Sequence, residues 1–385
     1  MQSTKPSDQV AFLDLKFCWN ELQDELETAM LTSVRSGMYI GGSDVETFEN
    51  EFAAYAGTEH CIGVGNGLDA ITVSLMTLQI GPGDEVIVPA HTFIASWLPI
   101  VRLGATVVPV APDMTTMNMN PDLLEQAITK NTRVVMPVHL YGRPAKLDQI
   151  AAICEHHKIP IIEDAAQAHG ATLNGKRIGS WGNTTCWSFY PGKNLGAAGD
   201  AGAITTNDPL IAKQARNIAN YGSSRKYIHE SIGINSRLDP VQAATLSVKL
   251  RHLEKWNTRR SQLAEHYINR LNTSDLILPP GNDTACSSWH LFVVRIEQRN
   301  ELAQFLADRG IQTLIHYPTA CSDHQAFSGL NIPASQAARD IANTALSLPI
   351  GPHLQLEDAD KVADAIKQFF GNNSKADRPP IASDS

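Results

Sequence analysis

Short apolar runs alternate with stretches of helical periodicity along the first part of the chain. The apolar runs lie at residues 61–65, 85–90, 106–112, 133–142 and 159–166. Strands that are apolar on both faces and are separated by helices are typical of a mostly parallel sheet that is covered on both sides. Ligands of such sheets bind beyond the carboxyl ends of the strands, so the loops that follow these runs are the first places to look for chemistry.

The pattern changes after about residue 250. The later elements are predicted as helices over 246–256, 259–271, 299–308 and 357–370, with an apolar strand over 289–296. We therefore expect an α/β domain over residues 10–250 and a smaller α+β domain over 251–371. Residues 372–385 have no apolar face, which predicts a disordered tail. In the large domain, the Ser-Asp-Val-Glu sequence that starts at Ser43 predicts a capping box, and Gly57 predicts the end of that helix.

Composition narrows the classes of protein that this chain can be. It holds 31 Lys and Arg against 40 Asp and Glu, a net charge of −9 without a basic block, which argues against a nucleic-acid partner. The longest uncharged apolar stretch, residues 86–101, is interrupted by prolines and is too short to span a bilayer, and the first residues lack a secretory signal. The six cysteines show no C-x-x-C spacing, which predicts reduced thiols rather than a metal site. We expect a cytoplasmic protein with no membrane partner and no bound metal.

The turn after the first apolar run is rich in glycine. Gly65, Asn66, Gly67 and Leu68 follow a predicted strand and open a predicted helix. Small residues let backbone N–H groups approach an anion there, and the helix N-terminus adds a partial positive charge. The spacing matches neither the dinucleotide fingerprint nor the P-loop. The turn is a candidate phosphate site, and a plain strand-to-helix turn is the alternative.

A second loop carries two adjacent carboxylates. Glu163 and Asp164 end an apolar strand, and Gln167 and His169 follow among small residues. A charge at the end of a buried strand is costly unless a cation compensates it. Two cations fit this position: a structural arginine, or the protonated ring nitrogen of a cofactor.

A third loop places a lysine among glycines. Lys193 follows a predicted strand that ends near Ser188, and Gly196, Gly199 and Gly202 leave the neighbouring backbone with little side-chain cover. This suits a lysine whose amine is held at a carbonyl group, and a solvated surface charge is the alternative. Pyridoxal phosphate needs a phosphate cup, an aromatic face, a carboxylate for its ring nitrogen and a lysine for its aldehyde. The chain offers these groups in that order.

These loops, with several other segments, resemble the DegT/DnrJ/EryC1/StrS family of sugar aminotransferases. The matching segments cover most of residues 10–370 and are SGMYIGG (36–42), GNGLDAI (65–71), PAHTFIAS (89–96), EDAAQAHGA (163–171), SFYPGKNLGAAGDAGAI (188–204), YGSSRKYIHESIGINSRLD (221–239) and LIHYP (314–318). The resemblance implies a fold-type I enzyme that depends on pyridoxal phosphate, with a mostly parallel seven-stranded sheet in the large domain. Residues 235–260 and 289–295 are most similar to the branch that aminates C3 of nucleotide-linked keto-deoxysugars.

The resemblance also implies roles for the cofactor-binding residues. Lys193 would hold the cofactor covalently and would move the proton between the cofactor and the sugar carbon. Asp164 would pair with the protonated pyridine nitrogen and keep the ring an electron sink. Gln167 would bond the phenolic oxygen of the cofactor, and Phe93 would stack on its ring. For Phe93, a place in the ordinary core is the alternative.

The implied phosphate site uses both subunits of a homodimer. The backbone of Gly67 and Leu68 and the hydroxyl of Ser188 would hold the phosphate, and Asn235 would reach it from the other subunit. Many family members have threonine where this chain has Leu68, so the backbone donors must do more of the work here. For Asn235, capping of the helix that follows is the alternative.

The predicted substrate residues come from four separate segments. They are Tyr39, His169, Lys226, Arg237, His316 and Tyr317. Lys226 and Arg237, with Arg225 nearby, are candidate cations for a nucleotide diphosphate. For His169 and His316, a purely structural role is the alternative.

The reaction that the resemblance implies is a transamination. L-Glutamate would donate the amino group, and a nucleotide-diphospho-6-deoxy-ketohexose would accept it at C3, for the synthesis of an amino sugar in a lipopolysaccharide or a glycoside. The open alternatives are amination at C4, a UDP-linked substrate, and a regulator that binds the cofactor without turnover. An oxidoreductase would need a dinucleotide loop, which the sequence does not show.

Overall fold

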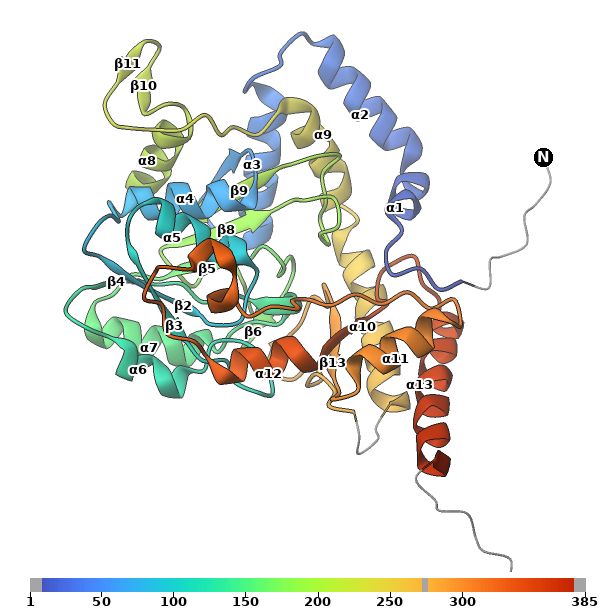
Figure 1. The fold of residues 1–385 in the computed structure, drawn as a ribbon. Coiled ribbons are helices and arrows are strands. Elements are labelled where there is room, and N and C mark those ends of the chain that lie inside the picture. The colour runs from blue at the N-terminus through green and yellow to red at the C-terminus, as the bar shows by residue number, and fades with distance from the viewer. Residues whose placement is uncertain (1–8, 272–275, 377–385) are drawn as a thin grey trace, which may run out of the picture.

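The structure, a computed structural model, describes residues 9–271 and 276–376. A mixed sheet lies at the centre of the large domain (Figure 1). A four-stranded part, β1-β9-β8-β5, joins a three-stranded part, β4-β2-β3, through parallel bridges from Val135 to Ile161 and from Val138 to Asp164. Within this sheet β9 runs antiparallel to both of its neighbours, and the other strands run parallel to one another. This is the mostly parallel, seven-stranded sheet that was predicted. Its strands are β1 (His60–Val64), β2 (Glu85–Pro89), β3 (Thr106–Val110), β4 (Thr132–Val135), β5 (Ile162–Asp164), β8 (Thr184–Ser188) and β9 (Gly202–Thr206).

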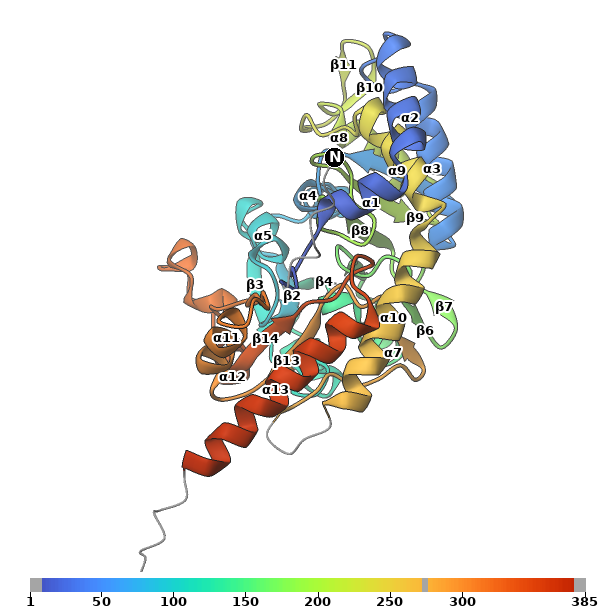
Figure 2. The same cartoon turned by 90° about the vertical axis from the view of Figure 1, so that its right-hand side faces the viewer.

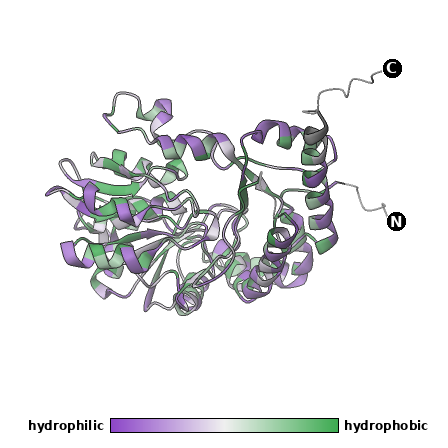
Figure 3. Ribbon diagram, turned by 90° about the horizontal axis from the view of Figure 1, so that it is seen from below, coloured by the Kyte–Doolittle hydropathy of each residue, from purple (hydrophilic) through white to green (hydrophobic). Residues whose placement is uncertain are grey.

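Alternate residues of each strand pack against two different layers of helices. On β1, Ile62 belongs to the core under α4, α5 and α8, whereas Cys61 belongs to the core under α3 and α9. Apolar side chains on both faces explain why these strands appear as continuous apolar runs, and in Figure 3 they are largely coloured as hydrophobic. The helices of the two layers are α3 (Ser43–Ala56), α4 (Gly67–Thr77), α5 (Leu98–Arg102), α6 (Leu124–Ala127), α7 (Leu147–His157), α8 (Pro209–Ala219) and α9 (Pro240–Leu250).

A second apolar core lies in the C-terminal part of the chain. The antiparallel pair β13 (Phe292–Arg295) and β14 (Ala345–Leu348) packs with α10 (Leu253–Arg270), α11 (Arg299–Ala307) and α13 (Leu356–Ala376). Helices α10 and α13 lie side by side in Figures 1 and 2. Val10 also belongs to this core, and its N–H donates to the carbonyl of Gly310. The predicted domain boundary after residue 250 lies in the short turn between α9 and α10.

The remaining helices and strands contribute little to the two cores, apart from Leu173 of β6, which belongs to the core under α3 and α9. They are α1 (Leu15–Glu21), α2 (Gln23–Arg35), α12 (Gln336–Thr344), the hairpin β10 (Ser223–Arg225) and β11 (Ile228–His229), and the small sheet of β6 (Thr172–Leu173), β7 (Lys176–Arg177) and β12 (Ala285–Cys286). Among the described residues, no helix has both the length and the apolar character that a membrane span requires.

Three local predictions were wrong. The helix predicted over 246–256 is interrupted, because α9 ends at Leu250 and α10 begins at Leu253. The start of α3 is not a capping box, because Gly42 is its N-cap residue and no side chain caps it, although Gly57 ends it in the left-handed conformation as predicted. The predicted tail begins too early, because α13 continues through residues 372–376, and residues 377–385 lie outside the described structure.

Candidate active site

One edge of the sheet brings the predicted cofactor residues together. The glycine-rich turn follows β1, Phe93 follows β2, Asp164 ends β5, and Lys193 lies in the loop after β8, which ends at Ser188. Because these four strands are parallel, their carboxyl ends lie at the same edge. The antiparallel strand β9 begins at this edge with Gly202. Residues that are far apart in the sequence therefore share one site.

The glycine-rich turn has the form of an anion cradle. Gly67 and Leu68 open α4, so their N–H groups have no partner within the helix. Asn66 is the N-cap residue, and its side-chain oxygen accepts a hydrogen bond from the Asp69 N–H at 2.8 Å. A Cβ atom on Gly67 would lie only 2.6 Å from the Cβ of Ser188, so glycine is required for the turn and Ser188 to lie this close together. Free backbone donors next to a hydroxyl fit a phosphate group.

The adjacent carboxylates Glu163 and Asp164 lie on opposite faces of β5 and have different environments. Asp164 is 5% exposed, and its carboxylate accepts hydrogen bonds from the Ser96 hydroxyl at 2.7 Å and the Ala166 N–H at 3.2 Å. Burial raises the pKa of Asp164, while the Ser96 hydrogen bond and the charge of Lys193 oppose that rise. Within residues 9–271 and 276–376 no arginine pairs with Asp164, so the structural-arginine alternative does not hold for it.

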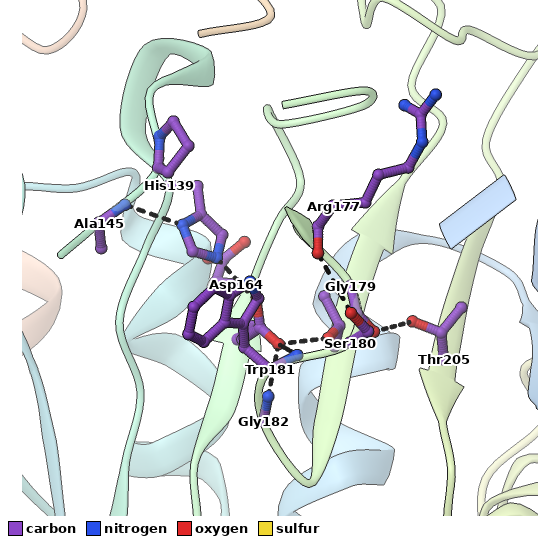
Figure 4. A network of polar contacts seen from close by, with 12 residues as sticks. His139, Ala145, Asp164, Arg177, Gly179, Ser180, Trp181, Gly182 and Thr205 are labelled. Carbon is purple, nitrogen blue, oxygen red and sulfur yellow. Dashed lines mark hydrogen bonds and ion pairs between the residues drawn. The ribbon is translucent and has the colours of Figure 1, made fainter. Parts of the chain in front are cut away.

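Glu163 instead belongs to a structural network of polar contacts, in which Figure 4 labels His139, Trp181 and Gly182. Its Oε1 atom accepts hydrogen bonds from the N–H groups of Trp181 (3.0 Å) and Gly182 (2.7 Å) and from the hydroxyl of Thr185 (2.9 Å). Its Oε2 atom lies 3.1 Å from Nε2 of His139, whose Nδ1 accepts from the Ala145 N–H at 3.0 Å. Because Nδ1 accepts, the proton of His139 lies on Nε2 and is donated to Glu163. Burial opposes ionisation of Glu163, but these hydrogen bonds outweigh it and lower the pKa of Glu163.

Lys193 is not a solvated surface charge. It is half-buried, and its amine makes no hydrogen bond or ion pair with any residue that the structure describes. Burial lowers the pKa of Lys193 to about 8, and Asp164 opposes that shift. The loop around it depends on Gly196, because a Cβ there would lie 2.3 Å from the carbonyl oxygen of Pro191. An amine that is partly neutral near neutral pH is a nucleophile and a proton carrier.

Phe93, Gln167 and Tyr317 form the wall next to these charged groups. Phe93 is 49% exposed, so the ordinary-core alternative is wrong, and its ring centroid lies 5.2 Å from that of Tyr317. The amide of Gln167 accepts from the Tyr141 N–H at 2.7 Å and donates to the Tyr317 hydroxyl at 3.0 Å. One N–H of the Gln167 amide remains for a further acceptor, so the predicted bond to a phenolic oxygen stays a prediction.

Several residues that support this wall were not predicted from the sequence. Ser96 and Thr92 lie in the segment after β2, where their hydroxyl oxygens are 2.8 Å apart. The Ser96 hydroxyl in turn donates its hydrogen bond to Asp164. Both belong to the quoted segment 89–96, so the motif itself contained the signal. His91 and Tyr141 are 2.8 Å apart, and the Tyr141 hydroxyl donates to the carbonyl of His316. No sequence signal connects those residues, because they come from three distant segments.

The two candidate histidines differ in their placement. His169 is fully buried against the rings of Trp187 and Phe189, and burial lowers its pKa to about 3. We correct the prediction that it faces the substrate, since its ring is enclosed by aromatic side chains of the core. His316 is half-buried, its Nδ1 lies 2.8 Å from the Ser347 hydroxyl, and burial with the charge of Lys193 lowers its pKa to about 4. His316 therefore remains a neutral candidate near Lys193.

Asn235 lies beside the phosphate turn of its own chain. The next residue, Ser236, accepts a hydrogen bond from the Gly65 N–H at 2.9 Å, while Asn235 itself is exposed. The capping alternative for Asn235 is wrong, because α9 begins at Pro240 after the N-cap residue Asp239. Whether its side chain serves this chain or a second one stays a prediction.

The segments that carry the other predicted substrate residues line a different cavity. Arg237 donates to Asn220 at 2.8 Å and lines a cavity of about 410 Å³ together with residues of the 36–42 loop and of β10. Lys193 and Asp164 do not line this cavity. Tyr39 in that loop is 64% exposed, and Lys226, in the tip of the β10–β11 hairpin, is exposed as well.

The residues at the sheet edge fit pyridoxal phosphate. The free N–H groups beside Ser188 suit its phosphate, the buried Asp164 without an arginine suits its ring nitrogen, the open face of Phe93 suits its ring, and the unpartnered amine of Lys193 suits its aldehyde. The fold and this site together define a pyridoxal-phosphate-dependent enzyme of fold-type I.

Comparison with known proteins agrees with this assignment. The DegT/DnrJ/EryC1/StrS aminotransferase family matches residues 20–367. The chain is 49% identical to the erythromycin biosynthesis sensory transduction protein EryC1 of Saccharopolyspora erythraea, over 93% of this chain and 99% of that protein. It is 47% identical to the dTDP-3-amino-3,4,6-trideoxy-α-D-glucose transaminase of Streptomyces venezuelae, over 96% and 98%. The crystal structure of S. venezuelae DesV in complex with a ketimine intermediate superposes with a TM-score of 0.92 at 47% identity, over 96% of this chain and 99% of that one. The chain belongs to the DegT/DnrJ/EryC1/StrS family and is a pyridoxal-phosphate-dependent nucleotide-sugar aminotransferase, which confirms the resemblance.

Proposed function

We propose that this enzyme transfers the amino group of L-glutamate to C3 of a dTDP-linked 6-deoxy-3-ketohexose in the cytoplasm. The observation that carries the transamination is the placement of Lys193 beside Asp164 at the carboxyl edge of the sheet. The name of the S. venezuelae relative, a dTDP-3-amino-sugar transaminase, supports the nucleotide and the position of the amino group. Lipopolysaccharide or glycoside biosynthesis is the proposed use of the product.

The chain's own residues supply binding and proton transfer. Pyridoxal phosphate, when bound, supplies a carbonyl that holds an amino group and a ring that delocalises the electron pair left after proton removal. With a pKa of about 8, the Lys193 amine can take a proton from one carbon atom and return it to another near neutral pH. Asp164 would keep the ring nitrogen of the bound cofactor protonated, and the hydrogen bond from Ser96 orients the Asp164 carboxylate. Phe93 and Tyr317, whose rings lie 5.2 Å apart, would cover the reacting atoms and limit the access of water.

We also propose a homodimer whose active sites contain residues of both chains. Tyr39, Lys226 and Arg237 belong to segments that gather away from Lys193 within one chain, so a second copy is needed to bring them to the sugar nucleotide. Large apolar side chains are exposed on the same segments, among them Met38 (53%) and Ile232 (88%), as expected for a surface that another protein covers.

A panel of keto-sugar nucleotides tests the proposed function. Purified enzyme would be incubated with L-glutamate and dTDP- or UDP-linked 3-keto and 4-keto sugars, and the products identified by mass spectrometry. We expect an amine at C3 of the dTDP-linked 3-keto sugar and no product with the Lys193→Ala variant. Preferred amination of a 4-keto or a UDP-linked sugar would replace the proposed substrate with that one.

The name of the S. erythraea relative, a sensory transduction protein, favours a second candidate function. A regulator would bind the cofactor and the sugar nucleotide without turnover. The same panel separates the two, because a regulator gives no amino sugar from any member while it still binds pyridoxal phosphate.

A further inference from the structure

Tyr141, in the segment after β4, connects three separate parts of the candidate active site. Its N–H donates to Oε1 of Gln167 at 2.7 Å, its hydroxyl donates to the carbonyl of His316, and the hydroxyl oxygen lies 2.8 Å from Nε2 of His91. The side chain is buried, and the backbone is in the left-handed region (φ 61°). That conformation is costly for a residue other than glycine and persists only where the surrounding contacts hold it.

The directions of these hydrogen bonds are fixed. The carbonyl of His316 can only accept, so the single hydroxyl proton of Tyr141 is donated to it. Nε2 of His91 must then donate to the Tyr141 oxygen. Burial lowers the pKa of His91 to about 4 and raises the pKa of Tyr141 well above its ordinary value, so His91 is neutral and Tyr141 keeps its proton near neutral pH. The network therefore holds one geometry at that pH.

The same network reaches the wall formed by Phe93, Gln167 and Tyr317. Tyr317 follows His316 in the chain, and its hydroxyl accepts a hydrogen bond from Nε2 of Gln167 at 3.0 Å. Its ring lies 5.2 Å from that of Phe93 and packs against the apolar cluster that contains Tyr141. Gln167 is buried, and because a backbone N–H can only donate, the Tyr141 N–H fixes which side of the amide is oxygen.

We propose that Tyr141 is a positioning residue for the bound cofactor. Its hydroxyl fixes the carbonyl of His316 and so keeps the next residue, Tyr317, against the amide of Gln167. Held between Tyr317 and the Tyr141 N–H, this amide presents its remaining N–H to the phenolic oxygen of pyridoxal phosphate. This role rests on the pyridoxal phosphate chemistry of the proposed function and on the bond predicted for Gln167, and not on which sugar nucleotide is aminated.

The visible absorbance of the bound cofactor reports on this amide. The phenolic oxygen shares a proton with the nitrogen that joins the cofactor to Lys193, and a second donor to that oxygen favours loss of the shared proton at lower pH. The pH midpoint of the absorbance change would be measured without substrate for the unmodified protein and for the Tyr141→Phe and Gln167→Ala variants, alone and combined. Tyr141→Phe keeps the ring and the N–H to Gln167 and removes only the hydroxyl.

The matched control is Tyr267→Phe. Tyr267 is fully buried in the small domain, and its hydroxyl donates to the carbonyl of Pro349 at 2.9 Å. Each of the two Tyr→Phe changes removes a buried hydrogen bond from a hydroxyl to a carbonyl, so the melting temperature of the cofactor-free protein should fall by roughly 1–3 °C in both. Only Tyr141→Phe should move the midpoint of the cofactor absorbance.

We expect the midpoint to rise by about one pH unit in Gln167→Ala and by at least about half a unit in Tyr141→Phe. The combined variant should show no further rise over Gln167→Ala, because both changes act on the same amide. An unchanged midpoint in Tyr141→Phe, an additive rise in the combined variant, or an equal rise in Tyr267→Phe would overturn the positioning role.

An unchanged midpoint in Gln167→Ala would overturn it as well, because the amide would then not reach the phenolic oxygen. The keto-sugar panel could still give the expected amino sugar in that case, so the proposed function would stand. If Tyr141→Phe does not fold, Tyr317→Phe takes its place, because it keeps the ring against Phe93 and removes the acceptor of the Gln167 amide. The same rise is expected, and an unchanged midpoint would again overturn the role of Tyr141.

Discussion

Burial acts in opposite directions on the two charged residues at the centre of the site. It lowers the pKa of Lys193 to about 8 and raises that of Asp164, and each residue reduces the shift of the other. Burial therefore brings the pKa values of the amine and the carboxyl group closer together.

The protein should be yellow when it is loaded with pyridoxal phosphate, and borohydride should attach the cofactor permanently to Lys193. The reason is that this amine is partly neutral and unpartnered at the sheet edge. Peptide mapping by mass spectrometry after reduction would locate the attachment. Finding the cofactor on another lysine would refute the assignment.

The rate at which the cofactor-free protein takes up pyridoxal phosphate should depend on pH through Lys193. Only the neutral amine attacks the aldehyde, so the rate should rise about tenfold per pH unit below a midpoint near 8 and level off above it. Return of the visible absorbance measures this rate. The Asp164→Asn variant should move the midpoint to lower pH, because Asp164 raises the pKa of Lys193. A midpoint near the ordinary lysine value of 10.5 would contradict the effect of burial.

Asp164→Asn should retain some cofactor and lose most of its turnover. A neutral amide cannot keep the ring nitrogen protonated, so we expect a loss of about 10²-fold or more in kcat, about 3 kcal/mol of transition-state stabilisation. Steady-state kinetics with L-glutamate would measure the loss. If the variant worked at nearly the normal rate, Asp164 would be only a structural charge.

At the scale of secondary-structure elements, β5 carries one carboxylate at the candidate active site, Asp164, and one that stabilises the fold, Glu163. Glu163 ties β5 to the turn at Trp181 and Gly182 and to His139 after β4. A Glu163→Gln change would place an amide N–H against the Nε2–H of His139, and we expect a loss of about 2–3 kcal/mol in the free energy of unfolding. Urea unfolding at neutral pH would measure it.

The matched control is Glu125→Gln, which removes a carboxylate beside His157 at the surface and should change stability by less than about 0.5 kcal/mol. The pKa of Glu163 is lowered in the folded state from its ordinary value of 4.5. The stabilisation of the folded state by ionised Glu163 is therefore complete above about pH 4.5, and it disappears as the pH falls through the lowered pKa of Glu163. Equal stability of the Glu163→Gln protein and the unmodified protein at neutral pH would contradict this role.

Elements with a regular apolar pattern could be predicted from the sequence, and their pairing in space could not. The runs that became β1, β2 and β3 were found within a residue or two, because strands that are apolar on both faces leave a local signal. The break between Leu250 and Leu253 was missed because apolar residues continue through it.

The candidate active site could likewise be predicted only in part from the sequence. Lys193, Asp164 and Phe93 lie in short motifs and could be predicted, and the fold brings them to one edge. The different environments of Glu163 and Asp164 depend on His139 and Ser96, which are contributed by other strands and loops. The burial of His169 likewise depends on Trp187 and Phe189, which no local pattern places around it.

At the scale of the whole molecule, the proposed homodimer can be tested by mixing two inactive variants. Lys193→Ala and Asn235→Ala proteins would be dissociated, mixed and reassociated. If Asn235 acts across the interface, each mixed dimer has one site with both residues intact. Random reassortment makes about half of the dimers mixed, so activity should return to roughly a quarter of that of the unmodified enzyme.

The control is proof of subunit exchange by mass spectrometry with one variant isotopically labelled. If Asn235 serves its own chain, as the contact between Ser236 and Gly65 also allows, no mixed dimer has an intact site and mixing restores nothing. A larger substitution at Asn235 would be used if the alanine variant kept most of its activity.

The succession of Glu163 and Asp164 has a consequence for insertions and deletions in the coding sequence. The segment is bridged at Ile161 to Val135 of β4 and at Asp164 to Val138 after β4, and the two carboxylates point to opposite faces because they are consecutive. An in-frame deletion of Ile162 would move the glutamate to the buried core position of Ile162 and would leave the shorter aspartate on the face toward His139. A substitution of Asp164 should reduce activity, and a substitution of Glu163 should reduce stability. A change of one residue in the length of this segment should reduce both.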